Sequence, residues 1–250
     1  VDGKALPGKN QSDCYRPDNY DGKFRGPIGL RDALAQSINV PAVKLLYLVS
    51  VKDALKVSED MGISTLTDPS RYGLTLVIGG GEVTLLDMAS AYGVFGNNGI
   101  RNPYTGILKV EDMNGTILEE FSQNEEEVLP KNVALTISDI LKNNTSRTPT
   151  FGATSPLLIP GREVAVKTGT TNSNKDAWII GYTPSISAGV WAGNNDNKPM
   201  KKGGAAMAGP IWNEFMREAL KIFPSEKFEE PELEVDPKVV KPALRGFWQG

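Results

Sequence analysis

Residues 167–171, Lys-Thr-Gly-Thr-Thr, have the composition of one wall of an active site. They continue an apolar run that begins at Val164, so the sequence predicts a strand that ends in a cation, hydroxyl groups and a glycine. A lysine at the end of a strand can project into a cleft, and a glycine lets a ligand backbone approach the strand edge. The hydroxyls can donate hydrogen bonds to an anion. We therefore expect this segment to bind a carboxylate and an amide.

Ser37, Ile38 and Asn39 form a second cluster, in the tight connection between two expected helices. Serine and asparagine in such positions commonly cap helices. They can also serve a site that faces Lys167, in which Ser37 relays a proton and Asn39 holds a substrate amide. Pro41 then fixes the start of the helix behind them. We expect Ser37 and Lys167 to face each other across one cleft.

The composition excludes several kinds of chemistry. The 250 residues include no histidine, which rules out a Ser-His-Asp triad and a histidine-ligated metal site. Cys14 is the single cysteine and permits neither an internal disulfide nor a cysteine metal cluster, so we expect no metal and no cofactor. The net charge of -3 offers no basic surface for nucleic acid. No apolar run approaches the roughly 20 residues of a membrane-spanning helix.

The first half of the chain is expected to be mostly helical, after an extended segment over residues 1–28. A short helix runs from Leu30 to about Gln36, and a second helix has Pro41 in its first turn. The residues of the second helix expected to face inward are Val43, Leu46 and Val49. Capping-box spacing predicts two further helices that begin at residues 51 and 85 and end at glycines. The residues concerned are Ser50, Asp53 and Gly62, and Thr84, Asp87 and Gly96 to Gly99.

The second half adds strands. Asn114-Gly115 lies between apolar runs and predicts a small β-hairpin over residues 107–121, and Pro130 opens a helix through about Lys142. Three short apolar runs predict a three-stranded antiparallel meander. These runs are residues 164–170, 177–182 and 187–192. The apolar face of a last long helix is marked by Ile211, Phe215, Ala219 and Ile222.

The two polar clusters, in this order, resemble motifs of the penicillin-recognising serine transferases. Three longer segments are similar to class A penicillin-binding proteins, the bifunctional enzymes of peptidoglycan synthesis. They are residues 19–46, 79–99 and 161–196, within a resemblance that covers most of residues 15–223. The third segment is the most specific, because its Thr-Thr-Asn, Asp-Ala-Trp and Gly-Tyr-Thr-Pro resemble class A in particular.

The resemblance implies a role for each site residue. Lys167 would supply positive potential and a proton link to Ser37, and Asn39 would hold the acyl side-chain amide of the donor. Thr168 and Thr170, with Gly169 and Thr171 beside them, would bind the terminal carboxylate of a D-Ala-D-Ala stem peptide or of a β-lactam. The Thr170 N–H would form one arm of an oxyanion hole. For Asp176 and Trp178 we expect structural roles, as a strand start and a core residue.

The resemblance also implies the fold, an α+β domain with an antiparallel sheet flanked by helices and a mostly helical subdomain. We expect a partial transpeptidase domain over residues 1–223, divided into the extended segment 1–28, the mostly helical part 29–160 with its hairpin, and the meander with the last helix over 161–223. Residues 224–250 are rich in Pro and Glu and are expected to be a linker.

The family's nucleophile motif, Ser-x-x-Lys, does not occur in the 250 residues. We expect the chain to be truncated at its N-terminus, to lack the first strands of the family's sheet and the nucleophile helix, and to form no covalent adduct with a penicillin. The nucleophile serine is therefore not in this chain. A parent protein would carry an upstream glycosyltransferase domain and a membrane anchor.

Two other functions stay open. One is a D,D-carboxypeptidase or β-lactamase of the same fold, in which water accepts the acyl group. The other is a non-catalytic module that binds or senses muropeptides or β-lactams. In the leading interpretation the domain is extracytoplasmic, either periplasmic or on the outer face of the cytoplasmic membrane, its partners are peptidoglycan stem peptides, and β-lactams inhibit it.

Overall fold

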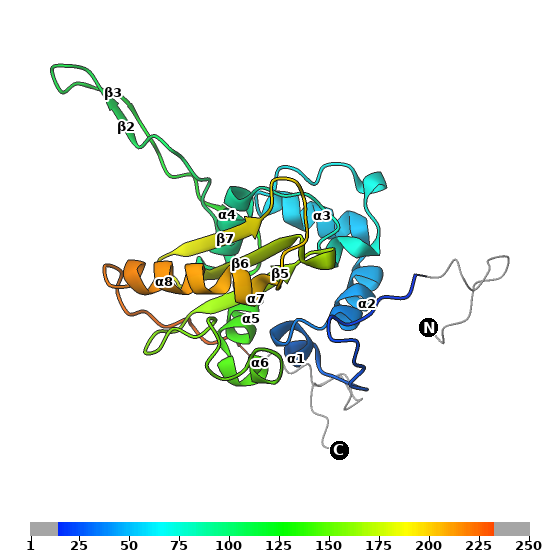
Figure 1. Cartoon of the computed structure of the whole chain (residues 1–250). Helices are drawn as coiled ribbons and strands as arrows, with labels where there is room; N and C mark the ends of the chain where they lie inside the picture. Colours follow the sequence, from blue (N-terminus) through cyan, green and yellow to red (C-terminus); the bar gives the residue numbers. More distant parts are fainter. Residues whose placement is uncertain (1–14, 233–250) are drawn as a thin grey trace.

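The computed structural model describes residues 15–232, which form an α+β domain built around a three-stranded antiparallel sheet (Figure 1). Cys14, the start of the predicted extended segment and the end of the predicted linker lie outside the described residues. The α+β class predicted from the sequence is confirmed.

Helices dominate the first half, as predicted. Their bounds are α1 Leu30–Ala35, α2 Asn39–Val49, α3 Val51–Asp60, α4 Leu85–Gly96, α5 Lys131–Lys142 and α6 Asn144–Phe151, with short 3-10 helices η2 Pro69–Arg71 and η3 Leu74–Ile78. The Ser50 and Thr84 side chains accept hydrogen bonds from the N–H groups of Asp53 and Asp87, which confirms both predicted helix starts.

The sheet consists of β5 Ala165–Thr170, β6 Asp176–Tyr182 and β7 Ser187–Gly193 in the order β5-β6-β7. Both pairs are antiparallel, and the register pairs Lys167 with Ile180 and Gly169 with Trp178. The predicted meander is therefore confirmed. The short helix η4 Asn172–Asn174 connects β5 to β6. Because β5 pairs only with β6 in the described chain, its outer edge is free to face a cleft.

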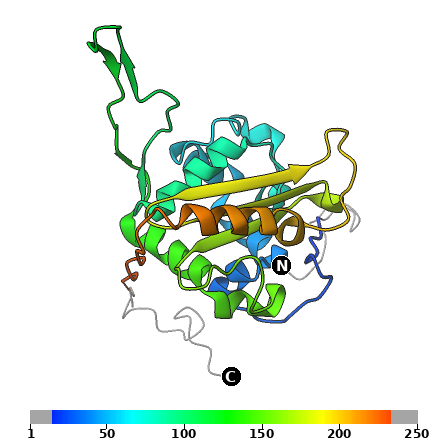
Figure 2. The same ribbon diagram turned by 60° about the vertical axis from the view of Figure 1, so that its left-hand side comes forward.

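Each face of the sheet is covered by helices (Figure 2). Helices α7 Gly204–Met207 and α8 Gly209–Ala219 pack on one face, where the indole N–H of Trp212 donates to the Ala188 carbonyl at 3.0 Å. The other face packs against α4 and α5 around Tyr182, which is fully buried and contacts Phe95. The sheet is thus a rigid support for the free edge of β5.

Two predicted buried faces are wrong in part. On α8 and the turn after it the predicted stripe is exposed, since Ile211 is 57%, Phe215 53% and Ile222 83% accessible, whereas the adjacent stripe of Trp212, Met216 and Leu220 is buried. Both stripes have helical spacing, and the one with the tryptophan buries more apolar area. On α2, Val43 and Leu46 are buried as predicted, but Val49, the last residue of the helix, is 45% exposed.

The predicted hairpin is confirmed as β2 Lys109–Glu111 paired with β3 Ile117–Glu120 around the Asn-Gly turn. It projects far from the body of the domain (Figure 1). A second short ladder pairs β1 Ile100–Arg101 with β4 Glu126–Glu127.

Residues 224–232 contact the domain. Phe228 is buried and packs edge-on against Tyr182, and the Asn132 side chain bonds both the carbonyl and the N–H of Glu232. The proposed domain end at residue 223 stays a prediction.

Candidate active site

Lys167 and Ser37 are brought together from positions 130 residues apart. The Lys167 ammonium donates a hydrogen bond to Ser37 Oγ at 2.6 Å and a second one to the Thr168 carbonyl at 2.8 Å. Lys167 lies on β5, and Ser37 lies in the connection between α1 and α2. The predicted juxtaposition is therefore present.

The α1–α2 connection holds Ser37 in an unusual backbone conformation. Its φ is 58°, in the left-handed region that costs a non-glycine residue roughly 1 kcal/mol or more. The turn is closed by the N–H of Ser37, which donates to the Leu34 carbonyl at 3.1 Å, and by that of Ile38, which donates to Ala33 at 2.9 Å. The tight turn thus aims the Ser37 hydroxyl at Lys167, and such strain is common at functional sites.

The capping interpretation of this cluster is wrong. The N-cap of α2 is Ile38, with no side-chain cap, and the Asn39 Nδ2 donates instead to the Asp18 carbonyl of the extended segment at 3.1 Å. Pro41 lies in the first turn of α2, as predicted.

Burial changes the acidity of Lys167. Desolvation lowers the pKa of its ammonium group from 10.5 to about 8, because a cation loses the solvation of water. Within residues 15–232 no ion pair to a carboxylate compensates this burial. About a tenth of the lysine is therefore neutral at pH 7. A lysine of this kind can exchange protons near neutral pH.

The free edge of β5 carries the groups predicted to bind substrate. The Thr171 N–H donates to the Asp176 carbonyl of β6 at 3.1 Å. Because the bonding direction alternates along an antiparallel strand, the N–H groups of Thr168 and Thr170 point away from β6. The Thr170 hydroxyl oxygen accepts a bond from the Gly204 N–H at 2.9 Å, which leaves its proton to donate elsewhere.

Gly169 lies on the same side of β5 as Lys167. A Cβ at Gly169 would meet the Trp178 Cβ at 3.1 Å, so a larger residue here would press against the neighbouring strand. The structure therefore offers a packing reason for this glycine beside the predicted ligand approach.

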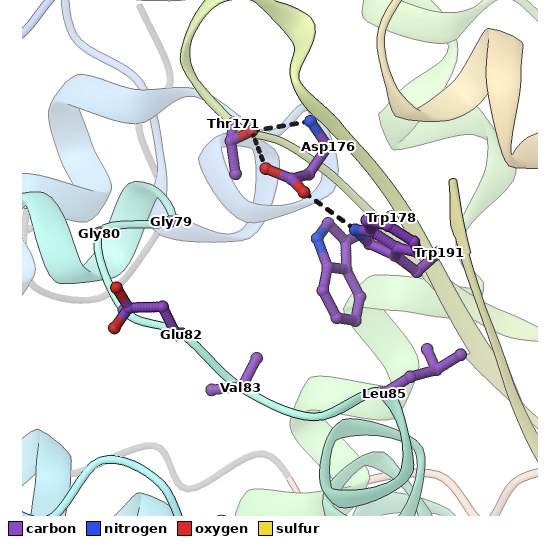
Figure 3. A pocket seen from close by; sticks show the side chains of 10 residues that line it. Gly79, Gly80, Glu82, Val83, Leu85, Thr171, Asp176, Trp178 and Trp191 are labelled. Carbon is purple, nitrogen blue, oxygen red and sulfur yellow. Dashed lines mark hydrogen bonds between the residues drawn. The ribbon is translucent and has the colours of Figure 1, made fainter. Parts of the chain in front are cut away.

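Beyond Thr171 the sheet edge opens into a cleft of about 560 Å³ (Figure 3). One wall consists of Thr171, Asp176, Trp178 and Trp191 from the sheet, and the other consists of the loop between η3 and α4. Asp176 begins β6 as predicted. The core role predicted for Trp178 is wrong, because its indole is only partly buried and lines the cleft.

Sequence reasoning did not single out Trp191 and Glu82 as site residues. Trp191 pairs with Trp178 in the β6–β7 register, and Glu82 follows three glycines in the loop of the opposite wall. The alternation of β7 could have placed Trp191 on the same face as Trp178. No pattern in the residues near Glu82 predicts that it lies opposite the sheet.

None of the helices within residues 15–232 combines the length and the apolar character that crossing a membrane requires. The same part of the chain contains no group of three or more Asp, Glu, Cys or His side chains arranged to hold a metal ion.

Comparison with known proteins supplies independent information. A family model described as the penicillin binding protein transpeptidase domain matches residues 3–217. Penicillin-binding protein 1A of Aquifex aeolicus is 37% identical over 224 residues, which are 89% of this chain and 30% of that protein. This chain therefore spans less than a third of that relative.

Two solved structures are similar as well. The penicillin-binding protein PonA1 from Mycobacterium tuberculosis has a TM-score of 0.76 at 27% identity, over 86% of this chain and 62% of that one. PonA1 in complex with penicillin V has a TM-score of 0.71 at 28% identity, with the same two coverages.

Proposed function

Because the chain belongs to the penicillin-binding protein transpeptidase family of acyl-transferring cell-wall enzymes, we propose that it forms one side of a D,D-transpeptidase site of the class A type. The substrates are peptidoglycan stem peptides that end in D-Ala-D-Ala, and β-lactams are inhibitors. The single observation that carries this proposal is the 2.6 Å hydrogen bond between Lys167, on the edge strand β5, and Ser37.

Lys167 and Ser37 act as the proton-transfer pair of the site. A lysine with a pKa of about 8 can release and recover a proton near neutral pH, and the Ser37 hydroxyl can pass that proton on. The remaining positive charge attracts the substrate carboxylate to the same edge.

The edge of β5 holds the donor peptide. Thr168 and Thr170 bind its terminal carboxylate through their hydroxyls, Gly169 and Thr171 border this position, and the outward Thr170 N–H stabilises the oxyanion. Asn39, at the start of α2, binds the amide of the acyl part. Its Nδ2 currently bonds the Asp18 carbonyl, so the substrate amide replaces that contact or uses the amide oxygen.

The reaction proceeds through a serine ester. The nucleophile serine gives up its hydroxyl proton to a basic group of the site as its oxygen attacks the penultimate D-Ala carbonyl. The peptide C–N bond then breaks, and a proton delivered through Ser37 goes to the terminal D-Ala, which leaves as an amine. The amine of a second stem peptide then attacks the ester carbon. The C–O bond breaks, and the serine oxygen recovers a proton while the cross-link forms.

The nucleophile is supplied from outside these 250 residues, since no serine or threonine here is followed by lysine three positions later. The proposal therefore includes a longer parent protein with the Ser-x-x-Lys motif, a glycosyltransferase domain and a membrane anchor, and an extracytoplasmic location. This chain alone is inactive in acylation. Residues 1–223 are its part of the domain, with residues 224–250 as a linker.

Labelling with a fluorescent penicillin tests the proposal. The parent protein should give an adduct that survives denaturation, and this chain alone should give none. In the parent, Ser37→Ala should slow acylation by about 10²–10⁴-fold, because it removes a proton relay. Ser58→Ala, which removes a hydroxyl from α3, is the matched control.

Other results of these labelling experiments would support a different role for Ser37 or a different function. If Ser37→Ala labels as fast as the unaltered parent, Ser37 has no part in proton transfer. A parent that binds penicillin reversibly and never forms an adduct is a sensing module, not an enzyme. A parent that hydrolyses D-Ala-D-Ala peptides and makes no cross-link is a carboxypeptidase.

A further inference from the structure

Helix α2 begins beside the candidate site without a capping side chain of its own. Its N-cap residue is Ile38, and its first residue, Asn39, lies two positions after Ser37. The first N–H groups of a helix have no partner within the helix, and a nearby polar side chain usually bonds one of them. The position of the turn that carries Ser37 therefore depends on a contact from another part of the chain.

Asn19 supplies the missing cap from 21 residues away. Its Oδ1 accepts a hydrogen bond from the Val40 N–H at 3.1 Å, and Val40 is the second residue of α2, where a local cap residue normally bonds. Asn19 is buried, with only 6% of its surface exposed, and its Nδ2 donates to the Lys23 carbonyl at 2.7 Å. Because the oxygen faces a donor and the nitrogen faces an acceptor, the side-chain amide has one orientation.

The preceding residue, Asp18, bonds the neighbouring side chain. Its carbonyl accepts a hydrogen bond from Asn39 Nδ2 at 3.1 Å. Two consecutive residues of the extended segment thus bond two consecutive residues at the start of α2. The contact with Asp18 orients the Asn39 amide and leaves its Oδ1 and one Nδ2 proton for a ligand.

The same segment also contacts the other wall of the site, at the end of β5. The Tyr20 hydroxyl donates to Asn174 Oδ1, in the η4 connection after β5, at 3.1 Å. A Cβ at Gly203 would meet the Thr170 Oγ1 at 2.8 Å and the Tyr20 hydroxyl at 3.2 Å, so these two oxygens approach the same point of the chain. Residues 18–20 therefore link the start of α2 to the end of β5.

We propose that Asn19 is a positioning residue of the transpeptidase reaction. It holds the start of α2, and thereby keeps the Ser37 hydroxyl where the Lys167 ammonium group donates to it at 2.6 Å. The assignment rests on the proposed function, because it takes the roles of Ser37 and Asn39 from there. Asn19 acts only through α2, since both ends of its side-chain amide are bonded within the chain.

The strained backbone of Ser37 makes this support necessary. Its φ of 58° is disfavoured for a residue with a Cβ, and such a conformation persists only where the surrounding structure fixes it. The bonds of the turn to Leu34 and Ala33 fix it on the α1 side, and the bond from Val40 to Asn19 fixes it on the α2 side. A shift of about 1 Å at a reacting group can cost about 10²-fold in rate. Loss of the Asn19 contact should therefore slow the proton transfer through Ser37.

Acylation of the parent protein by a fluorescent penicillin tests this role. Stopped-flow kinetics separate the dissociation constant of the first complex from the rate constant of acylation. Asn19→Leu has a similar size and no polar atom, so it should lower the acylation rate constant about 10–100-fold and change the dissociation constant less than about fivefold. Asn19→Asp keeps an acceptor for the Val40 N–H, at a helix N-terminus that favours negative charge, and should recover the rate to within about threefold.

The matched control removes the cap of a helix that contributes no residue to the site. Asn143 Oδ1 accepts from the Ser146 N–H at 3.0 Å and caps α6, so Asn143→Leu should lower stability and leave the acylation rate unchanged. Urea unfolding shows whether each variant is folded. If Asn19→Leu does not fold, Asn19→Ser takes its place, because its shorter side chain stays polar and does not reach the Val40 N–H.

A second measurement needs only this chain. The NMR signal of Lys167 Cε, followed as a function of pH, reports on the contact between Lys167 and Ser37. Its midpoint should lie at about 8 in the unaltered chain. In Asn19→Leu it should lie about half a pH unit higher or more, because a loosened turn admits water to the ammonium group. Asn143→Leu should keep the unaltered midpoint.

The inference is overturned if Asn19→Leu is acylated as fast as the unaltered parent, or if its Lys167 midpoint does not move. Equal losses of rate in Asn19→Leu and Asn143→Leu also overturn it, since the effect would then be one of stability. An unaltered parent that penicillin does not label rejects the proposed function instead, and the Lys167 titration then supports or overturns the part of the inference that concerns the Ser37 turn.

Discussion

Replacement of Lys167 by methionine should stabilise this chain at neutral pH. The lysine is partly buried on β5, and its ammonium group has no carboxylate partner among the ion pairs of residues 15–232. Methionine has a similar length and no charge, so Lys167→Met removes the desolvation penalty and keeps the packing. The residue would then be retained for its chemistry at a cost in stability.

The size of the expected change in the free energy of unfolding follows from the pKa of Lys167. The difference between the ordinary 10.5 and the value of about 8 in the folded state corresponds to roughly 3 kcal/mol, at about 1.36 kcal/mol per pH unit. The variant loses the hydrogen bonds to Ser37 and to the Thr168 carbonyl, which are worth about 1 kcal/mol together or somewhat more. We therefore expect Lys167→Met to raise the free energy of unfolding by about 1–2 kcal/mol at pH 7.

The pH dependence has a definite sign. Between pH 8 and 10.5 the unfolded chain holds the Lys167 proton and the folded chain has released it, so the stability of the unaltered chain rises with pH in this window. Below pH 8 the folded chain bears the full cost of desolvating the Lys167 ammonium group, and above pH 10.5 this cost is gone. The unaltered chain should therefore become the more stable of the two near the top of the window.

Urea unfolding of both chains at several pH values between 7 and 10.5 measures this difference, and other titrating groups cancel in the comparison. Lys221→Met, at a position whose side chain is 67% exposed, is the control and should change stability by less than about 1 kcal/mol at each pH. The reasoning is refuted if Lys167→Met is destabilising at pH 7, or if the difference between the two chains does not depend on pH.

Three further substitutions, each with a comparison variant, test how the fold is held. Thr84→Ala should lower stability by about 1 kcal/mol because α4 loses its N-cap, whereas Thr84→Ser should not, as urea midpoints would show. Met216→Ala should cost about 2–5 kcal/mol and Ile222→Ala almost nothing, and equal losses would mean that the buried face of α8 is misassigned. Gly181→Ala places a Cβ 2.2 Å from the buried indole of α8 and should lower the melting temperature, while Gly106→Ala, with nothing within 4 Å, should leave it unchanged.

The local elements were predictable because their signals are local. The caps at Ser50 and Thr84 and the Asn-Gly turn act within a few residues, and each depends on the chemistry of the side chains involved. The three strands of the sheet have short connections, so their antiparallel order also follows from the chain.

It was harder to predict which side chains of a helix or strand face the core. The two apolar stripes of α8 are one residue apart, and the choice of the Trp212 stripe depends on which side chains fit the sheet. The exposure of Trp178, in strand β6, also depends on tertiary packing. Its position was predicted, but the open cleft beside it exists because the loop of Glu82 stands opposite at a distance that no local pattern specifies.

The sequence by itself determined the family, the order of the elements and the residue types available for chemistry, because these depend on composition and short-range spacing. Only the tertiary structure decided that the Lys167 ammonium reaches Ser37, since 130 residues separate them and the strained turn at Ser37 supplies the direction. Burial in that contact, which no sequence pattern specifies, is also what lowers the pKa of Lys167 to about 8 and gives an ordinary lysine the chemistry proposed for it.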